Sequence, residues 1–357
     1  MRKTLSDMAM HLKNLIPTEI PDTYAINITF KDVKNEESIY EGVLAFRDFL
    51  YRLCDVLIAD GDFYDNNKKI THAFDNRSSI SVHYPFLHNV ERLLSNIGLH
   101  GVLAEGSNFT ISGNDMLNSK LSGLKNLECL RFLATCGICF DGIDLDEKKP
   151  DLSKIERIII SYPDNTAMLT GLKVMAIAQK EFWSNDNTDN LLRCDYRSLS
   201  NERLEAVSIL KELIKPLSIN IQNYVLKLHQ RYLDKGLSCD IKIKDFWIKI
   251  YYSYKKREVW AVNTSLNNGY QISVKAENTH EYTDVVKSFP LYLQEMIARG
   301  YGCGKKRGIS SNCDGGCRGL RISLDESILG ITDEIETWFD DELSCLQGAG
   351  RKVNVQI

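Results

Sequence analysis

The sequence predicts an α+β protein of two domains. The chain has 357 residues, more than the roughly 100–200 residues of a usual domain. Apolar residues recur three or four positions apart in several segments, which is typical of amphipathic helices. Between residues 239 and 275 apolar and polar residues alternate instead, around an Asn-Gly pair at Asn268 and Gly269. That pattern is typical of antiparallel strands joined by a tight turn.

The N-terminal domain is predicted to cover residues 1–190. It begins with two β-rich runs at 24–30 and 38–44, which predict a hairpin. Apolar positions three or four apart then predict a helix at 46–61. The other elements predicted for this domain are a strand at 78–84, a helix at 86–98, a hairpin at 100–113, a helix at 121–133, strands at 140–145 and 155–163, and a helix at 164–183.

The C-terminal domain is predicted to cover residues 191–346. A helical pair comes first, at 201–215 and 219–236, separated at Pro216. A small antiparallel β-meander follows at 239–275, and helices flank it. The last elements predicted are a helix at 281–300 interrupted at Pro290, a strand at 319–325 and a helix at 326–343. Residues 347–357 are expected to form a mobile tail.

The composition is that of a globular protein. Hydrophobic residues make up 43% and charged residues 26%, both ordinary values for a folded soluble domain. No run approaches the roughly 18–20 apolar residues of a membrane span, and the N-terminus lacks the apolar segment of a signal peptide. We therefore expect a cytoplasmic protein with no membrane partner. In that setting its ten cysteines should be thiols, metal ligands or redox groups.

The charge is unevenly distributed along the chain. The formal net charge is −4, but residues 1–196 hold 21 Lys and Arg against 28 Asp and Glu. Residues 197–357 hold 23 basic and 20 acidic residues. Neither half is as basic as a dedicated nucleic-acid-binding domain. A site for a polyanion would therefore have to be local.

The segment 300–321 combines glycine, cysteine and basic residues in the sequence GYGCGKKRGISSNCDGGCRGLR. A glycine-rich loop loses much backbone freedom on folding, so a metal, a disulfide or a bound anion must hold it. Cys313 and Cys317 have a spacing found in zinc sites, and Cys345 could reach the loop as a further ligand. Three states stay open: free thiols, a redox disulfide, or a zinc site made by Cys303, Cys313, Cys317 and Cys345.

The same loop is a candidate anion-binding site. Glycine backbone N–H groups can form a concave anion site, and nearby cations strengthen it. The segment does not match the P-loop or the dinucleotide-binding motif, and the alternative is a solvated basic loop. The predicted anion-binding residues are Lys305, Lys306, Arg307, Arg318 and Arg321.

A lone CxxC motif at Cys136 and Cys139 is a weaker candidate. In a redox site the motif stands at the start of a helix, whereas here the predicted helix precedes it, so redox catalysis is disfavoured. We interpret these residues as core thiols beside aspartates that cap a loop. The aspartates are Asp141, Asp144 and Asp146. Three further thiols are expected to be buried: Cys54, Cys129 and Cys194.

The meander mixes aromatic and lysine residues, which can stack bases or sugars on an exposed sheet face. The alternative is ordinary packing against the 281–299 helix. Strand alternation divides the run at 247–254 between two faces. The face predicted to be core carries Ile248, Ile250, Tyr252 and Tyr254, and the more exposed face carries Trp247, Lys249, Tyr251 and Ser253.

The motifs of hydrolases and kinases are absent from the sequence. The sequence therefore does not decide whether the chain is an enzyme. The leading hypothesis is a non-enzymatic binding or regulatory protein whose cysteine-organised basic loop contacts an anionic partner, either an anionic ligand or nucleic acid. The alternative is an enzyme of unknown class acting in a cleft between the two domains.

Overall fold

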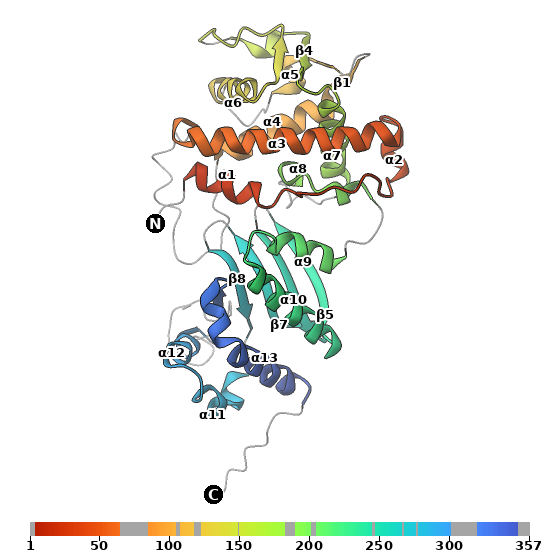
Figure 1. Cartoon of the computed structure of the whole chain (residues 1–357). Coiled ribbons are helices and arrows are strands. Elements are labelled where there is room, and N and C mark those ends of the chain that lie inside the picture. The colour runs from red at the N-terminus through yellow and green to blue at the C-terminus, as the bar shows by residue number, and fades with distance from the viewer. Residues whose placement is uncertain are drawn as a thin grey trace, which may run out of the picture. The chain divides into compact units, whose positions relative to one another are not determined.

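The computed structural model shows an α+β protein with two antiparallel sheets, as predicted (Figure 1). It describes residues 4–64, 85–104, 108–117, 123–148, 150–182, 190–200, 205–244, 247–265, 268–275, 278–300 and 320–348. The contacts divide the chain into two compact units. The first holds the described residues up to Ser200 together with Lys244, and the second holds the others. The predicted boundary at residue 190 stays a prediction; residues 190–200 pack in the first unit.

Helices form most of the N-terminal unit. Helix α3 packs against α1 and α7, and α7 also packs against α4. The α-helices are α1 (Leu5–Lys13), α2 (Ile28–Lys31), α3 (Glu36–Tyr64), α4 (Pro85–His100), α5 (Gly113–Met116), α6 (Gly123–Thr135), α7 (Met168–Phe182) and α8 (Asn190–Arg193). The described part of this unit also contains the short 3₁₀ helices η2 (Leu152–Lys154) and η3 (Tyr196–Leu199).

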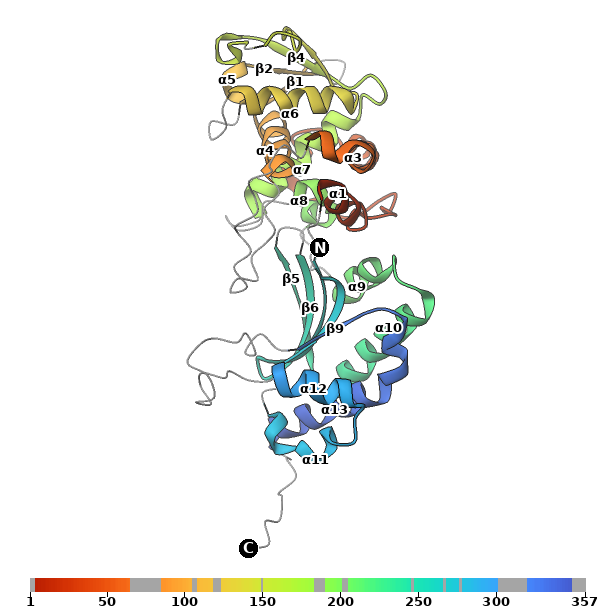
Figure 2. The same cartoon turned by 90° about the vertical axis from the view of Figure 1, so that its left-hand side faces the viewer.

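The small sheet of this unit has the order β1-β2-β4-β3 and is antiparallel throughout. Its strands are β1 (Val102–Leu103), β2 (Phe109–Ile111), β3 (Cys139–Asp141) and β4 (Ile158–Ser161). The predicted hairpin at 100–113 is thereby confirmed. In β4, buried Ile158 and Ile160 alternate with half-buried Ile159 and Ser161, so one face of the sheet is core. Helix α6 lies beside this sheet in Figure 2.

The hairpin predicted at 24–44 is wrong, because these residues form α2 and the start of α3. The side-chain oxygens of Asn27 and Asn35 accept hydrogen bonds from the backbone N–H groups of Thr29 and Ser38. Such caps satisfy the free N–H groups of a helix start. Buried Ile39 and Val43 then continue the helical spacing into the predicted helix. Tertiary packing therefore overrides the β propensity of this segment.

Helices α3 and α7 pack closely at a pair of glycines. A Cβ atom on Gly171 would lie 2.0 Å from the carbonyl oxygen of Gly42. A Cβ atom on Gly42 would lie 2.7 Å from the backbone nitrogen of Gly171. No Cβ atom fits at such distances. Glycine at both positions therefore allows the two backbones to approach each other.

The C-terminal unit contains a five-stranded sheet in sequential order. Its strands are β5 (Ser238–Lys244), β6 (Trp247–Tyr254), β7 (Arg257–Ser265), β8 (Gly269–Val274) and β9 (Leu320–Ser323). The predicted meander is confirmed, although the run at 239–254 forms two strands. Gly269 has φ +63°, the positive value expected from the Asn-Gly pair.

Helices of this unit cover one face of the sheet, with α9 and α10 on the same side (Figure 2). The helices are α9 (Ala206–Ile214), α10 (Ile219–Asp234), α11 (Thr283–Val286), α12 (Leu291–Gly300) and α13 (Thr332–Leu346), with 3₁₀ helices η4 (Thr279–Glu281) and η6 (Glu326–Ile331). The predicted interruption at Pro290 is confirmed, because α11 ends before it and α12 begins after it.

An aromatic cluster forms the core between the sheet and two helices. The rings of Tyr252 and Trp260 stack with centroids 3.9 Å apart and an interplanar angle of 4°. Phe339 of α13 stacks on Trp260 at 5.4 Å, and Tyr232 of α10 meets it edge-on at 5.6 Å. The sheet therefore packs against α10 and α13 at this cluster. The predicted contact of the 281–299 helix with the sheet is made at the edge strand, where α12 contacts β9.

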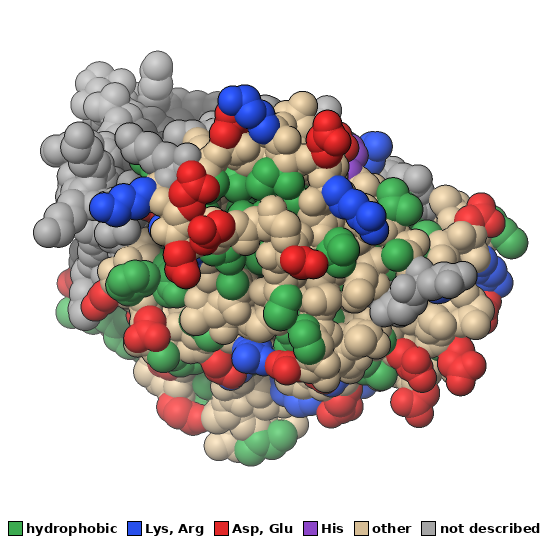
Figure 3. All heavy atoms as spheres, turned by 90° about the horizontal axis from the view of Figure 1, so that it is seen from above, with side chains coloured by type: hydrophobic (Ala, Val, Ile, Leu, Met, Phe, Trp, Pro, Cys, Tyr) green, Lys and Arg blue, Asp and Glu red, His purple; other side chains and the backbone are tan. Residues whose placement is uncertain are grey.

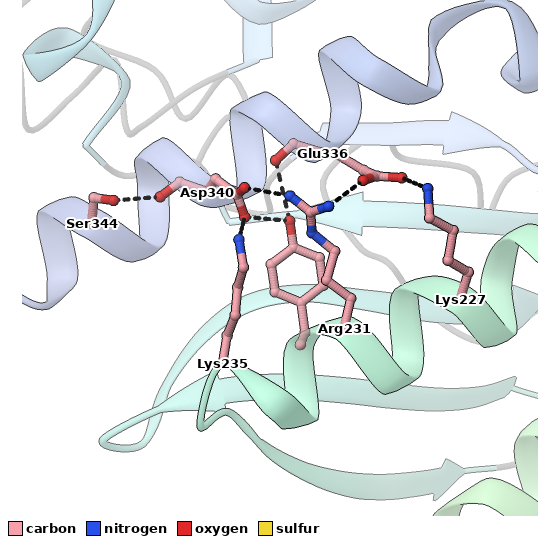
Figure 4. A network of polar contacts seen from close by, with 7 residues as sticks. Lys227, Arg231, Lys235, Glu336, Asp340 and Ser344 are labelled. Atoms are coloured by element: carbon pink, nitrogen blue, oxygen red, sulfur yellow. Dashed lines mark hydrogen bonds and ion pairs between the residues drawn. The ribbon is translucent and has the colours of Figure 1, made fainter.

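Ion pairs join α10 to α13 over this core (Figure 4). Arg231 contacts Glu336 at 2.7 Å and Asp340 at 2.6 Å. Lys227 contacts Glu336 at 2.9 Å, and Lys235 contacts Asp340. The hydroxyl of Tyr232 also donates a hydrogen bond to Asp340, at 2.9 Å. The network thus fixes how the two helices lie against each other.

We expect Asp340→Asn to destabilise the C-terminal unit in a pH-dependent way. Burial alone would raise the pKa of Asp340, but hydrogen bonds from Lys235, Arg231 and Tyr232 outweigh it and lower the pKa. The stabilisation is therefore present above the unfolded pKa of about 4 and is lost as the pH falls through the folded value. Urea unfolding should show a loss of about 1 kcal/mol at neutral pH that disappears in acid.

Asp234→Asn is the matched control, because Asp234 is exposed at the end of α10 and its hydrogen bond comes from neutral Gln230. Its effect on the free energy of unfolding should be smaller at every pH. A loss in Asp340→Asn that stays constant from neutral to acidic pH would contradict the role given to the charge.

Candidate anion-binding site

Only two of the predicted site residues lie within the described part of the chain. They are Arg321, in β9, and Cys345, in α13. The others lie outside the described residues: Cys303, Lys305, Lys306, Arg307, Cys313, Cys317 and Arg318. The loop at 301–319 therefore stays a prediction.

Cys345 is half-buried. Burial raises the pKa of its thiol, and the nearby carboxylates of Glu342 and Glu281 raise it further. Within the described ranges, no group of three or more His, Cys, Asp or Glu side chains could hold a metal ion. The predicted zinc site depends on the loop at 301–319, and metal analysis of the purified chain tests it.

The CxxC motif is separated into a buried and an exposed thiol. Cys136 is fully buried, and burial raises its pKa to about 12, whereas Cys139 is exposed. The interpretation as a core thiol is confirmed for Cys136 and wrong for Cys139. Asp144 caps its loop by accepting a hydrogen bond from the backbone N–H of Asp146, at 2.9 Å. The other thiols predicted to be buried, Cys54, Cys129 and Cys194, are buried.

The face of the C-terminal sheet opposite the aromatic core is polar. Strand register places Lys249, Asn263 and Gln271 in one row across β6, β7 and β8. The next row holds Tyr251, Ala261, Ser273 and Arg321 across β6 to β9. We call this side of the sheet, whose central residues are buried, the polar face. Its described residues include Lys242, Lys249, Tyr251, Glu258, Ala261, Asn263, Gln271, Ser273, Lys275 and Arg321.

The predicted alternation of β6 is confirmed as far as Tyr252. Ile248, Ile250 and Tyr252 are buried, whereas Trp247, Lys249 and Tyr251 are half-buried. The register shifts between Tyr252 and Ser253. Because of this irregularity, Ser253 is buried although it was predicted to be exposed, and Tyr254 is half-buried although it was predicted to be core.

Lys249 is a half-buried cation of the polar face. Its side chain is 14% exposed, and its Nζ donates to both carboxylate oxygens of Glu258 at 2.6 Å. Burial lowers the pKa of Lys249; Glu258 raises it, while Lys275 and Lys242 lower it, and the net result is a lowered pKa. Desolvation and the two neighbouring lysines together therefore outweigh the effect of the Glu258 carboxylate on Lys249.

Two ammonium groups lie over the ring of Tyr251. Lys242 Nζ is 5.0 Å from the ring centroid, and Lys249 Nζ is 5.8 Å from it. Both distances suit cation–π contacts. The Tyr251 ring therefore already contacts cations, which weakens the idea that this aromatic residue is an open stacking surface for a base.

Amide and hydroxyl groups form the middle of the polar face. Asn263, Gln271 and Ser273 are 4%, 9% and 6% exposed. Asn263 Nδ2 donates to Ser273 Oγ at 3.2 Å. The side-chain oxygen of Gln271 is buried and has no hydrogen-bond partner in the described part of the chain. A buried carbonyl oxygen without a donor costs about 1–3 kcal/mol, so a bound donor there would be stabilising.

The N-terminal unit presents a different surface. Figure 3 shows acidic side chains spread over the face it views, with a few basic ones between them. The excess of acidic residues in 1–196 agrees with that picture. An anion would be repelled from such a surface.

No known family model, curated protein or solved structure matches this chain. Among its described helices, none has the length and apolar character needed to cross a membrane.

Proposed function

We propose that this chain is a non-enzymatic binding protein that recognises an anionic ligand on the polar face of its C-terminal sheet. The observation that carries the proposal is the gathering of Lys242 and Lys249 over one ring, that of Tyr251. Lys275 adds its charge to the same place. Lys242 and Lys275 both lower the pKa of Lys249, so these like charges repel, and a bound anion would reduce that repulsion.

Arg321 supports the same proposal from the other end of the row. It lies opposite Ser273, in the strand next to β8. A guanidinium group binds carboxylate or phosphate through two parallel hydrogen bonds, which a lysine does not do. The predicted basic residues Lys305, Lys306, Arg307 and Arg318 come directly before β9 in the sequence. We propose that they add charge to the same site.

Charge reversal tests the proposal. Lys242→Glu and Arg321→Glu should each weaken binding of inorganic phosphate to the full chain by about tenfold, because each change removes one attraction and adds one repulsion. Isothermal titration calorimetry at low and moderate salt measures this. The affinity of the wild type should fall as salt is raised.

Lys211→Glu is the matched control, because Lys211 is an exposed residue of α9 and makes the same change in net charge. Its phosphate affinity should stay within about twofold of wild type. Heparin and RNA titrations show whether a polyanion is preferred. Equal phosphate affinities in all three variants, or no binding of any of these anions, would contradict the proposal.

A further inference from the structure

We infer that the ligand is a phosphorylated sugar, an anion that carries hydroxyl groups. This inference rests on the proposed function and adds the chemical class of the ligand. It comes from a part of the polar face that the lysines do not explain, namely the buried amides beside them.

The side-chain oxygen of Gln271 needs a hydrogen-bond donor. The residue is nine-tenths buried, and this oxygen has no partner among the described residues. Register places Gln271 on the same face as Lys249 and directly opposite Asn263. A phosphate ion at neutral pH offers mainly acceptor oxygens and at most two O–H groups, whereas a sugar carries several hydroxyl groups that can donate to the Gln271 oxygen. The ligand must therefore bring an N–H or O–H group.

A hydroxyl group on the ligand suits this site better than an amine. An ammonium group on the ligand would be repelled by Lys242 and Lys249, which lie over the neighbouring Tyr251 ring. A hydroxyl group carries no charge and can donate and accept at once. It can donate to the Gln271 oxygen while accepting from an amide N–H group of the same face. Hydroxyl groups therefore suit this surface better than amines.

The spacing between Gln271 and Arg321 fits a ligand that carries both a phosphate and hydroxyl groups. Neighbouring strands lie about 4.8 Å apart, and same-face residues two apart along a strand lie about 7 Å apart. Gln271 and Arg321 belong to adjacent rows on adjacent strands. The phosphate and the ring hydroxyls of a pentose phosphate are separated by a comparable distance. One such molecule can therefore meet both the amide row and a basic side chain.

The polar face favours a sugar phosphate over a nucleotide. A base would be recognised by stacking on an aromatic ring. The Tyr251 ring instead contacts two ammonium groups. The polar face therefore favours the phosphate and hydroxyl groups over a base.

Calorimetry on the full chain tests this inference with ribose 5-phosphate, inorganic phosphate and AMP. Ribose 5-phosphate should bind at least tenfold more tightly than phosphate, and AMP should bind no more tightly than ribose 5-phosphate. Gln271→Met keeps the length of the side chain and removes both amide groups. It should abolish the advantage of ribose 5-phosphate and leave phosphate affinity within about twofold of wild type.

The outcomes distinguish the two proposals. Equal binding of phosphate and ribose 5-phosphate to the wild type overturns the sugar inference alone, and this comparison needs no variant to fold. AMP binding tenfold more tightly than ribose 5-phosphate also overturns it. If neither phosphate nor ribose 5-phosphate binds the wild type, the proposed function fails as well.

Discussion

Trp260→Ala should destabilise the C-terminal unit by about 3–5 kcal/mol, the usual cost of removing a large buried aromatic side chain. Trp260 is fully buried and stacks on both Tyr252 and Phe339. Its loss would leave a cavity between the sheet and helices α10 and α13, which the closely packed rings around it cannot fill. Urea unfolding followed by circular dichroism gives the free energy directly.

Trp247→Ala is the matched control, because it deletes the same side chain from a half-buried position in the neighbouring strand β6. It should cost less than half as much as Trp260→Ala. Equal losses in the two variants would mean that the aromatic cluster does not dominate the stability of this unit.

Gly171→Ala should destabilise the N-terminal unit by about 3 kcal/mol, near the upper end of the usual cost of overpacking. The added Cβ would lie 2.0 Å from the carbonyl oxygen of Gly42 and 2.8 Å from the Cβ of Phe46. The first of these contacts is with backbone, so α3 and α7 would have to move apart. A shift of the thermal or urea midpoint assigned to this unit measures the effect.

Gly123→Ala supplies the comparison, since a Cβ at the start of α6 would meet no heavy atom within 4 Å. It should be neutral or slightly stabilising, because alanine favours a helix by up to about 1 kcal/mol over glycine. If Gly171→Ala proved as harmless as Gly123→Ala, the close approach of α3 and α7 would be incorrect.

Local sequence patterns correctly predicted the helices and turns that tertiary packing also favours. The spacing of apolar residues predicted α4, α6 and α10, and the Asn-Gly pair predicted the turn between β7 and β8. The hairpin predicted at 24–44 was wrong because side-chain caps at Asn27 and Asn35 start helices in a β-rich run. Propensity alone does not weigh a cap against the preference of a β-branched residue.

The polar face was only partly predictable. Alternation in β6 placed Lys249 and Tyr251 on one face, but pairing them with Asn263 requires the register of β6 and β7. The turn between those strands uses Lys255 and Lys256, with φ of +47° and +68°, where glycine or asparagine would have been the usual signal. The irregularity at Tyr252 and Ser253 shifts the register again. Glu258, Asn263, Gln271 and Ser273 were therefore missed.

Methyl-TROSY NMR of the alanine-labelled full chain shows whether a ligand binds on the polar face of the sheet. Ala261 lies in the row between Tyr251 and Ser273, so its methyl group is a reporter within the polar face. Titration with ribose 5-phosphate should shift the Ala261 signal and leave Ala206 in α9 and Ala45 in α3 unmoved. An Ala261 signal that stays in place at saturating ligand would contradict binding on this face of the sheet.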